Sequence, residues 1–128
     1  MKAGLTICAA VAAVAVSAFA IPAGATTPAK GAHKSECSLS QDEQNGGLGA
    51  SYVYSLKTRN LDCDRAKKLV KDFHKCRHEN GGRSGKCPSV DGYDCKQKKL
   101  DSSPQLQQWK ATCKSGSKKF KQTFGESR

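Results

Sequence analysis

Residues 62–76, which read DCDRAKKLVKDFHKC, decide the fold of this chain. Apolar side chains recur in this stretch at helical spacing and share one face with Cys76: Ala66, Leu69, Val70 and Phe73. Lysines occupy the opposite side. Asp62 or Asp64 supplies an N-cap, and Asn80-Gly81-Gly82 ends the segment. The pattern therefore predicts one amphipathic helix.

Cysteine pairing follows partly from this helix. Cys63 and Cys76 are 13 residues apart, so on one helix they lie ~20 Å apart along its axis, whereas a disulfide needs Cα atoms within about 7 Å. These two cysteines are therefore not expected to pair with each other. We prefer the pairs Cys76–Cys87, Cys95–Cys113 and Cys37–Cys63, among the fifteen pairings that six cysteines allow.

Extended segments are predicted on both sides of the helix. Tyr52–Leu56 has the aromatic and β-branched composition of a strand. Asp91-Gly92 favours a tight hairpin in which Val90 faces Tyr93. Residues 106–113 and 118–124 are expected to form two more strands, joined by residues 114–117. Together these elements predict an α+β domain.

The N-terminus has the features of a cleaved signal peptide over residues 1–25. Lys2 is followed by an uncharged, small or apolar run from Leu5 to Ala20, with small-x-small sites ending at Ala20 and Ala25. A membrane anchor is the alternative, but the run is short for a bilayer and Pro22 follows it. We expect cleavage after Ala25, a flexible arm over residues 26–50 and a basic domain over residues 51–128.

Loss of residues 1–25 leaves an even number of cysteines. The chain has seven, and removal of Cys8 leaves Cys37, Cys63, Cys76, Cys87, Cys95 and Cys113. An even number in a short exported chain indicates a disulfide framework, because so small a domain buries little apolar surface. Zinc is the competing use of these cysteines, but no Cys-x-x-Cys pair occurs.

Asn60-Leu61-Asp62-Cys63, Gly92-Tyr93-Asp94-Cys95 and Thr112-Cys113-Lys114 are the motifs that carry a resemblance. Over residues 52–124 the chain resembles a class of small secreted proteins from high-GC Gram-positive bacteria, the actinobacteria. The resemblance implies a helix packed on a small antiparallel sheet, for which we expect three to four strands. It implies no activity and no functional residues.

Charge is the strongest functional signal. Lys plus Arg number 22 against 11 Asp plus Glu, and removal of Lys2 with the signal peptide changes the net charge from +11 to +10. Lysines concentrate in the last strands, where they predict an anion-binding face: Lys96, Lys98, Lys99, Lys110, Lys114, Lys118, Lys119 and Lys121. Such a face attracts polyanions, although lysines also simply keep a secreted protein soluble. Base-stacking aromatics are sparse, and Trp109 and Phe120 are expected in the core.

Catalytic and metal motifs are weaker. His74 and His78 stand four residues apart beside Cys76 and Glu79, but a His-Glu-x-x-His motif and a recognisable third ligand are absent from the sequence. A small nuclease or hydrolase would use the same histidines as general acid and base, yet no Gly-x-Ser-x-Gly motif occurs. Arg83 and Lys86, on a glycine-rich loop beside Cys87, resemble the exposed basic residue of a protease inhibitor.

The sequence thus predicts a secreted, non-enzymatic cationic protein that acts at or outside the cell envelope through its Lys-rich face. The expected partners are anionic cell-surface polymers or lipids, with no cofactor, no metal and no specific nucleic acid. A secreted antimicrobial protein or a protease inhibitor is the alternative, and a small secreted hydrolase is third.

Overall fold

The computed structural model describes residues 33–128, so the predicted signal peptide and residues 26–32 lie outside the described part. Six strands form one antiparallel sheet in the order β1-β2-β6-β5-β4-β3. The strands are β1 (Lys34–Glu36), β2 (Tyr52–Arg59), β3 (Ser89–Val90), β4 (Tyr93–Ser102), β5 (Leu106–Ser115) and β6 (Lys118–Ser127). The helix is α1 (Cys63–Glu79), and two short helical turns are η1 (Glu43–Gly47) and η2 (Gly82–Ser84).

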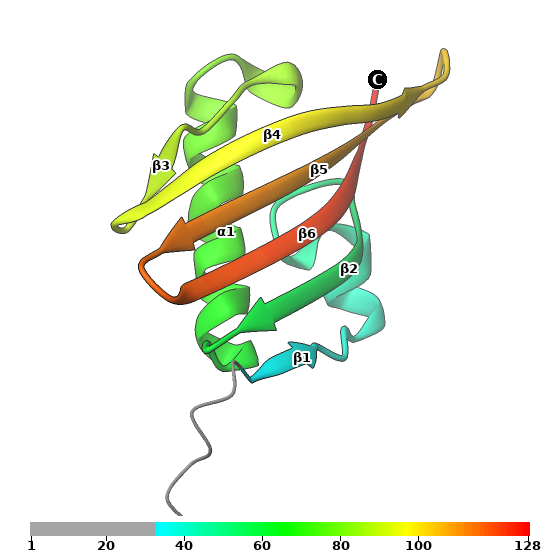
Figure 1. Ribbon diagram of the computed structural model, residues 1–128. Helices are drawn as coiled ribbons and strands as arrows, with labels where there is room; N and C mark the ends of the chain where they lie inside the picture. Colours follow the sequence, from blue (N-terminus) through cyan, green and yellow to red (C-terminus); the bar gives the residue numbers. More distant parts are fainter. Residues whose placement is uncertain (1–32) are drawn as a thin grey trace, which may run out of the picture.

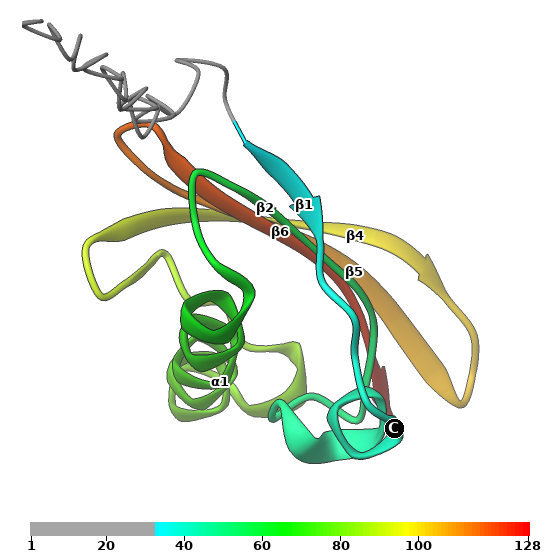
Figure 2. The same ribbon diagram turned by 90° about the horizontal axis from the view of Figure 1, so that it is seen from below.

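The molecule has two layers (Figure 1). Figure 2 shows α1 on one side of the sheet, and within residues 33–128 no helix covers the other side. The α+β class and the single main helix are confirmed, but six strands replace the three to four expected. None of the helices within residues 33–128 has the length and apolarity needed to cross a bilayer.

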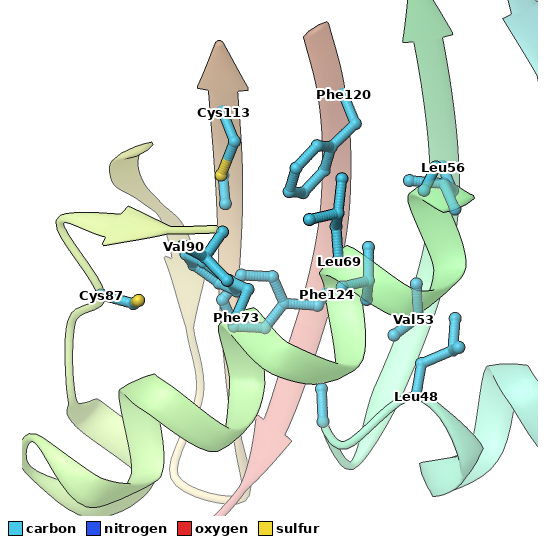
Figure 3. Packing of buried hydrophobic residues seen from close by; sticks show 14 of the residues in the cluster. Leu48, Val53, Leu56, Leu69, Phe73, Cys87, Val90, Cys113, Phe120 and Phe124 are labelled. Atoms are coloured by element: carbon cyan, nitrogen blue, oxygen red, sulfur yellow. The ribbon is translucent and has the colours of Figure 1, made fainter. Parts of the chain in front are cut away.

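Helix α1 begins and packs as its sequence predicts. The Asp62 carboxylate accepts a hydrogen bond from the Arg65 backbone N–H at 2.8 Å, which satisfies one of the donors at the helix start. Its buried apolar side chains are Ala66, Leu69, Val70 and Phe73. Figure 3 shows Leu69 and Phe73 directed toward Phe120 and Phe124 of β6. Burial of this face, rather than helix propensity alone, holds the helix on the sheet.

The strands extend beyond their predicted limits. β5 and β6 meet in a two-residue turn, Gly116-Ser117, with Ser115 opposite Lys118, so the expected four-residue connection is corrected. Gly116 has a φ of 57°, a conformation that glycine adopts without steric cost. β4 runs to Ser102, although Lys96–Lys99 lacks the apolar alternation by which strands are recognised.

The predicted Asp-Gly hairpin is present. Val90 pairs with Tyr93, and both turn residues have positive φ, 45° at Asp91 and 80° at Gly92. A type I′ turn requires this conformation. The Cys95 N–H also donates to the Pro88 carbonyl at 2.8 Å, which agrees with the expected register.

Residues 33–50 are ordered, which corrects the expectation of a flexible arm for this part of residues 26–50. They contain β1 and η1, and Leu48 is fully buried. Gly46 and Gly49 have φ of 104° and 96°, so the glycine run allows the chain to turn and insert Leu48 beneath the sheet. A Cβ at Gly49 would lie 2.9 Å from Cβ of His74, so the backbone packs closely against α1 here.

Three disulfides join the layers and loops. They are Cys37–Cys63, Cys76–Cys87 and Cys95–Cys113, the pairs preferred from the sequence. The first ties the segment after β1 to the start of α1, and the second ties the end of α1 to the loop before β3. Cys95 and Cys113 face each other in the β4–β5 register. The bridges supplement a small core at both ends of the helix.

Candidate functional site

The side of the sheet away from α1 is the candidate site, and we call it the open face. Side chains alternate along each strand, and paired residues on neighbouring strands share a face. The residues paired with buried Phe120, Gln122 and Phe124 face the helix, so the intervening positions face outward. This register assigns to the open face the basic residues Lys34, Lys57, Arg59, Lys96, Lys98, Lys110, Lys114, Lys119 and Lys121.

These basic residues form rows across the strands. Lys34 pairs with Arg59, Arg59 with Lys119, and Lys119 with Lys114, so one row crosses β1, β2, β6 and β5. Neighbouring strands are about 4.8 Å apart, which brings like charges close together. In the next row, Lys57 pairs with Lys121. Like charges directly opposite each other destabilise a sheet, so the arrangement has an electrostatic cost that favours a bound anion.

Lys119 lies at the centre of the longest row. Its pKa is lowered from the ordinary lysine value, first by partial desolvation and then by repulsion from four positive neighbours, Lys114, Lys121, Arg59 and Lys34. A shift of this direction means that the protein surroundings disfavour the charged form. An anion placed beside Lys119 would reverse this effect.

The open face is uneven but has no enclosed cleft among the described residues. A shallow depression between β1, β2 and β6 is lined by Lys34, Glu36, Lys57, Arg59, Lys119 and Lys121. A second depression, at the β5–β6 turn, shares Arg59 and Lys119 with the first. A third lies over β4 and β5. The depressions therefore follow one another across the strands.

Acidic residues stand at the margins of this face. Glu36 is on the edge strand β1, where a carboxylate oxygen lies 4.0 Å from Nζ of exposed Lys57. Asp94 and Asp101 lie near opposite ends of β4. Exposed pairs of this kind contribute little to stability, so the central cations are left largely uncompensated.

The structure brings together most, but not all, of the predicted lysine set. Six of the eight lie on the open face, whereas Lys99 and Lys118 do not. Lys99 pairs with Trp109 and its Nζ lies 5.8 Å from the centre of that indole ring, on the helix side. Lys34, Lys57 and Arg59 were missed. The alternation of Lys57 and Arg59 with buried Leu56 and Thr58 is the signal that identifies two of them.

Of the two histidines on α1, His74 belongs to a buried network under the sheet, whereas His78 remains exposed at its edge. His74 is fully buried, with Nε2 2.8 Å from Oε1 of Gln122 and Nδ1 accepting from Nε of Arg77 at 3.2 Å. Both ring nitrogens are therefore engaged. Burial, followed by repulsion from Arg77, lowers the pKa of His74 to about 3. Within residues 33–128, no three His, Cys, Asp or Glu side chains are grouped as metal ligands.

Arg77 and Glu126 complete this network, and sequence reasoning identified neither. Arg77 is fully buried, forms an ion pair with Glu126 and lies 4.5 Å above the Phe124 ring. Glu126 also accepts from the backbone and hydroxyl of Ser51, and His78 Nε2 lies 3.1 Å away. The pKa of Glu126 is lowered, because these hydrogen bonds and the Arg77 charge outweigh the opposing effect of burial. This arrangement ties the end of α1 to β6 and to Ser51.

The Arg83/Lys86 loop is more fixed than the sequence indicates. Arg83 lies in the helical turn η2, where its side chain donates to the Ser127 carbonyl at 2.8 Å and its own carbonyl accepts from Arg77. A Cβ at Gly85 would lie 1.9 Å from the Arg77 carbonyl oxygen, so the loop packs tightly on the helix end. Arg83 and Lys86 are both exposed, and the hydrogen bond to the Ser127 carbonyl fixes the Arg83 side chain.

Comparison with known proteins adds no relative: no family model, no curated protein and no solved structure matches this chain. We therefore infer the function from the chemistry of the site itself.

Proposed function

We propose that this protein binds an extended anionic polymer at or outside the cell envelope, through its open face. The observation that supports this most strongly is the row Lys34–Arg59–Lys119–Lys114, in which positive side chains from four strands converge on Lys119. Rows of fixed cations attract a polyanion and release its counterions.

The shape of the open face favours a long ligand over a small one. Small-molecule sites are concave and bury most of the ligand, whereas the depressions here are shallow and succeed one another over β1, β2, β6, β5 and β4. A polymer with repeated anionic groups can occupy several of them at once. Each added contact then acts at high effective concentration, so weak single contacts give useful affinity.

The disulfides support the proposed location. Three bridges in one small domain are typical of proteins in an oxidising compartment. Outside the cell, the chemistry complementary to this face is that of phosphate-bearing or carboxylate-bearing wall polymers and acidic lipid headgroups. We propose no catalytic step, because His74 is buried with both ring nitrogens engaged and Nε2 of the more exposed His78 lies against Glu126.

The chain offers a matched pair of variants that tests this proposal. One variant replaces Lys114, Lys119 and Lys121 of the open face with glutamine. The other replaces Lys68, Lys71 and Lys75, which are exposed on α1 on the far side of the molecule. Both lose the same charge. With long-chain polyphosphate as the probe, we expect the open-face variant to bind at least tenfold more weakly and the helix variant to bind within about twofold of wild type.

Salt dependence completes the experiment. Wild-type binding should weaken steeply between 0.1 M and 1 M salt, because the screening length falls from ~10 Å to ~3 Å. Equal losses in the two variants would show that net charge alone drives binding and would contradict an open-face site. Failure of the wild-type protein to bind at low salt would refute the function.

A further inference from the structure

Two exposed tyrosines lie on the open face beyond the lysine rows. Tyr52 and Tyr54 retain 39% and 47% of their surface, and apart from Leu100 they are the only exposed large hydrophobic residues within residues 33–128. Their ring centres are 6.2 Å apart and the ring planes differ by 14°. The two rings are therefore adjacent and nearly parallel, in a sheet whose other described aromatic side chains are buried.

The chain uses a bulge and a glycine to place these two rings. The β2–β6 register shifts between Val53 and Ser55, so Tyr54 is the extra residue of a bulge, a feature that redirects a side chain. Tyr54 lies over Gly125, where a Cβ would come within 2.6 Å of the tyrosine Oη. Gly125 continues the outward-facing series of Lys119, Lys121 and Thr123 on β6. Both tyrosines therefore share the open face with the lysines.

The tyrosines stand at the opposite end of β6 from Lys119. Gly125 comes six positions after Lys119, which corresponds to about 20 Å along a strand. A depression beside the rings is lined by Tyr52, Tyr54, Gln105, Leu106 and Ser127, so polar groups adjoin the two rings. A ligand that follows β6 from the lysine rows reaches this depression.

We propose that Tyr52 and Tyr54 form a stacking subsite for sugar rings, so the polyanion bound by the open face is an acidic glycan. This inference rests on the proposed function. The C–H face of a pyranose is apolar and packs on an aromatic ring, while its hydroxyls suit Gln105 and Ser127. Charge complementarity with the lysine rows requires that the same chain carry anionic groups. The disulfides favour a glycan over nucleic acid, because they indicate an extracellular setting.

The test compares three anionic probes on one pair of proteins. Polyphosphate has no ring, polygalacturonate has a carboxylate on each sugar ring, and poly(dT) has bases. The variant is Tyr52→Ser/Tyr54→Ser, and both side chains are substantially exposed. We expect this variant to bind polygalacturonate at least tenfold more weakly than wild type, whereas binding of polyphosphate and poly(dT) is unchanged. An unchanged melting transition shows that the variant is folded.

Three results overturn the inference and leave the proposed function standing. The first is wild-type binding of polyphosphate without binding of polygalacturonate. The second is unchanged polygalacturonate binding by the tyrosine variant. The third is a loss of poly(dT) affinity in the tyrosine variant as large as its loss of polygalacturonate affinity, which would show that the tyrosines stack on nucleic-acid bases. If wild type binds none of the probes, the proposed function itself fails.

Discussion

Buried charged side chains are paired on the helix side of the sheet, whereas the exposed ones of the open face are mostly unpaired. On the side that α1 covers, the buried Arg77 forms an ion pair with Glu126 and its Nε donates to Nδ1 of His74. On the open face, the only ion pair within residues 33–128 is Glu36–Lys57, at 4.0 Å and largely exposed. The comparison shows that the buried charges maintain the structure, whereas the exposed charges remain available to a ligand.

Loss of the buried cation should give the largest effect on stability. Arg77→Met leaves Glu126 without its charge partner in a nearly inaccessible position, and removal of one partner of a buried pair costs about 3–5 kcal/mol. Urea denaturation measures this change in the free energy of unfolding. The control is Lys75→Met, on the exposed side of the same helix, which should unfold almost as wild type does. Equal midpoints for the two variants would contradict the distinction between the faces.

Acid should weaken the buried network before it affects the open face. His74 has a folded pKa of about 3 against 6.5 for the ordinary group, so the unfolded chain binds a proton that the folded chain excludes. Stability is therefore lost as pH falls from about 6.5 toward 3, with a slope of about one proton. Glu126 contributes a further loss as pH falls below 4.5, the ordinary pKa of a glutamate, because its folded pKa is also lowered.

Denaturation midpoints measured across this pH range test the assignment. His74→Gln should remove the slope between pH 6.5 and 4.5, although the variant is less stable at pH 7. Lys119→Gln, on the open face, should keep the same dependence of stability on pH between 6.5 and 4.5. A slope that persists in His74→Gln would show that another group is responsible.

The β4–β5 disulfide should give an effect of about 3 kcal/mol. Cys95 and Cys113 close a loop with a sequence separation of 18. Loss of such a bridge raises the conformational entropy of the unfolded chain and so lowers the free energy of unfolding by about this amount. The Cys95→Ala/Cys113→Ala variant should therefore melt at a lower temperature. Its affinity for polyphosphate below the transition should stay near that of wild type, because both cysteines lie on the helix side. A stable variant with lost binding would contradict this separation.

The sequence predicts some parts of this structure better than others, and the two faces of the sheet differ in this respect. The helix, its cap and the disulfide pairs follow from local rules: periodicity at Ala66–Phe73, an Asp at the N-cap, and the distance that forbids Cys63–Cys76. The β4 strand and the segment around Leu48 cannot be predicted from local rules. Their lysine-rich and glycine-rich sequences acquire regular structure only by pairing or packing with distant parts of the chain.

The open face was predictable only in part. Lysines near one another in sequence fall on both sides of the sheet, so Lys98 faces outward and Lys99 contacts Trp109. Lys34 and Arg59 join the face because β2 pairs with β6, a long-range choice. The tyrosine pair depends on a bulge, and the Arg77–Glu126 pair joins residues 49 positions apart. Local patterns do not reveal such contacts.

Neutralising the central lysine should give the smallest effect on stability and should still affect binding. Positive neighbours lower the pKa of Lys119, so Lys119→Gln relieves repulsion and should raise Tm slightly. Its polyphosphate affinity should nevertheless fall more than that of Lys98→Gln, which removes a lysine near the edge of the sheet. Equal losses would mean that the rows do not converge on Lys119.

Lysine footprinting with polyphosphate would show directly which face of the protein contacts the polymer. Wild-type protein is acetylated with and without the polymer, and the modification of each lysine is read by mass spectrometry. The account predicts protection of the open-face lysines Lys57, Lys110, Lys114, Lys119 and Lys121, with little change at Lys68, Lys71 and Lys75 on the helix. Protection of the helix lysines, or uniform protection of both sets, would contradict it.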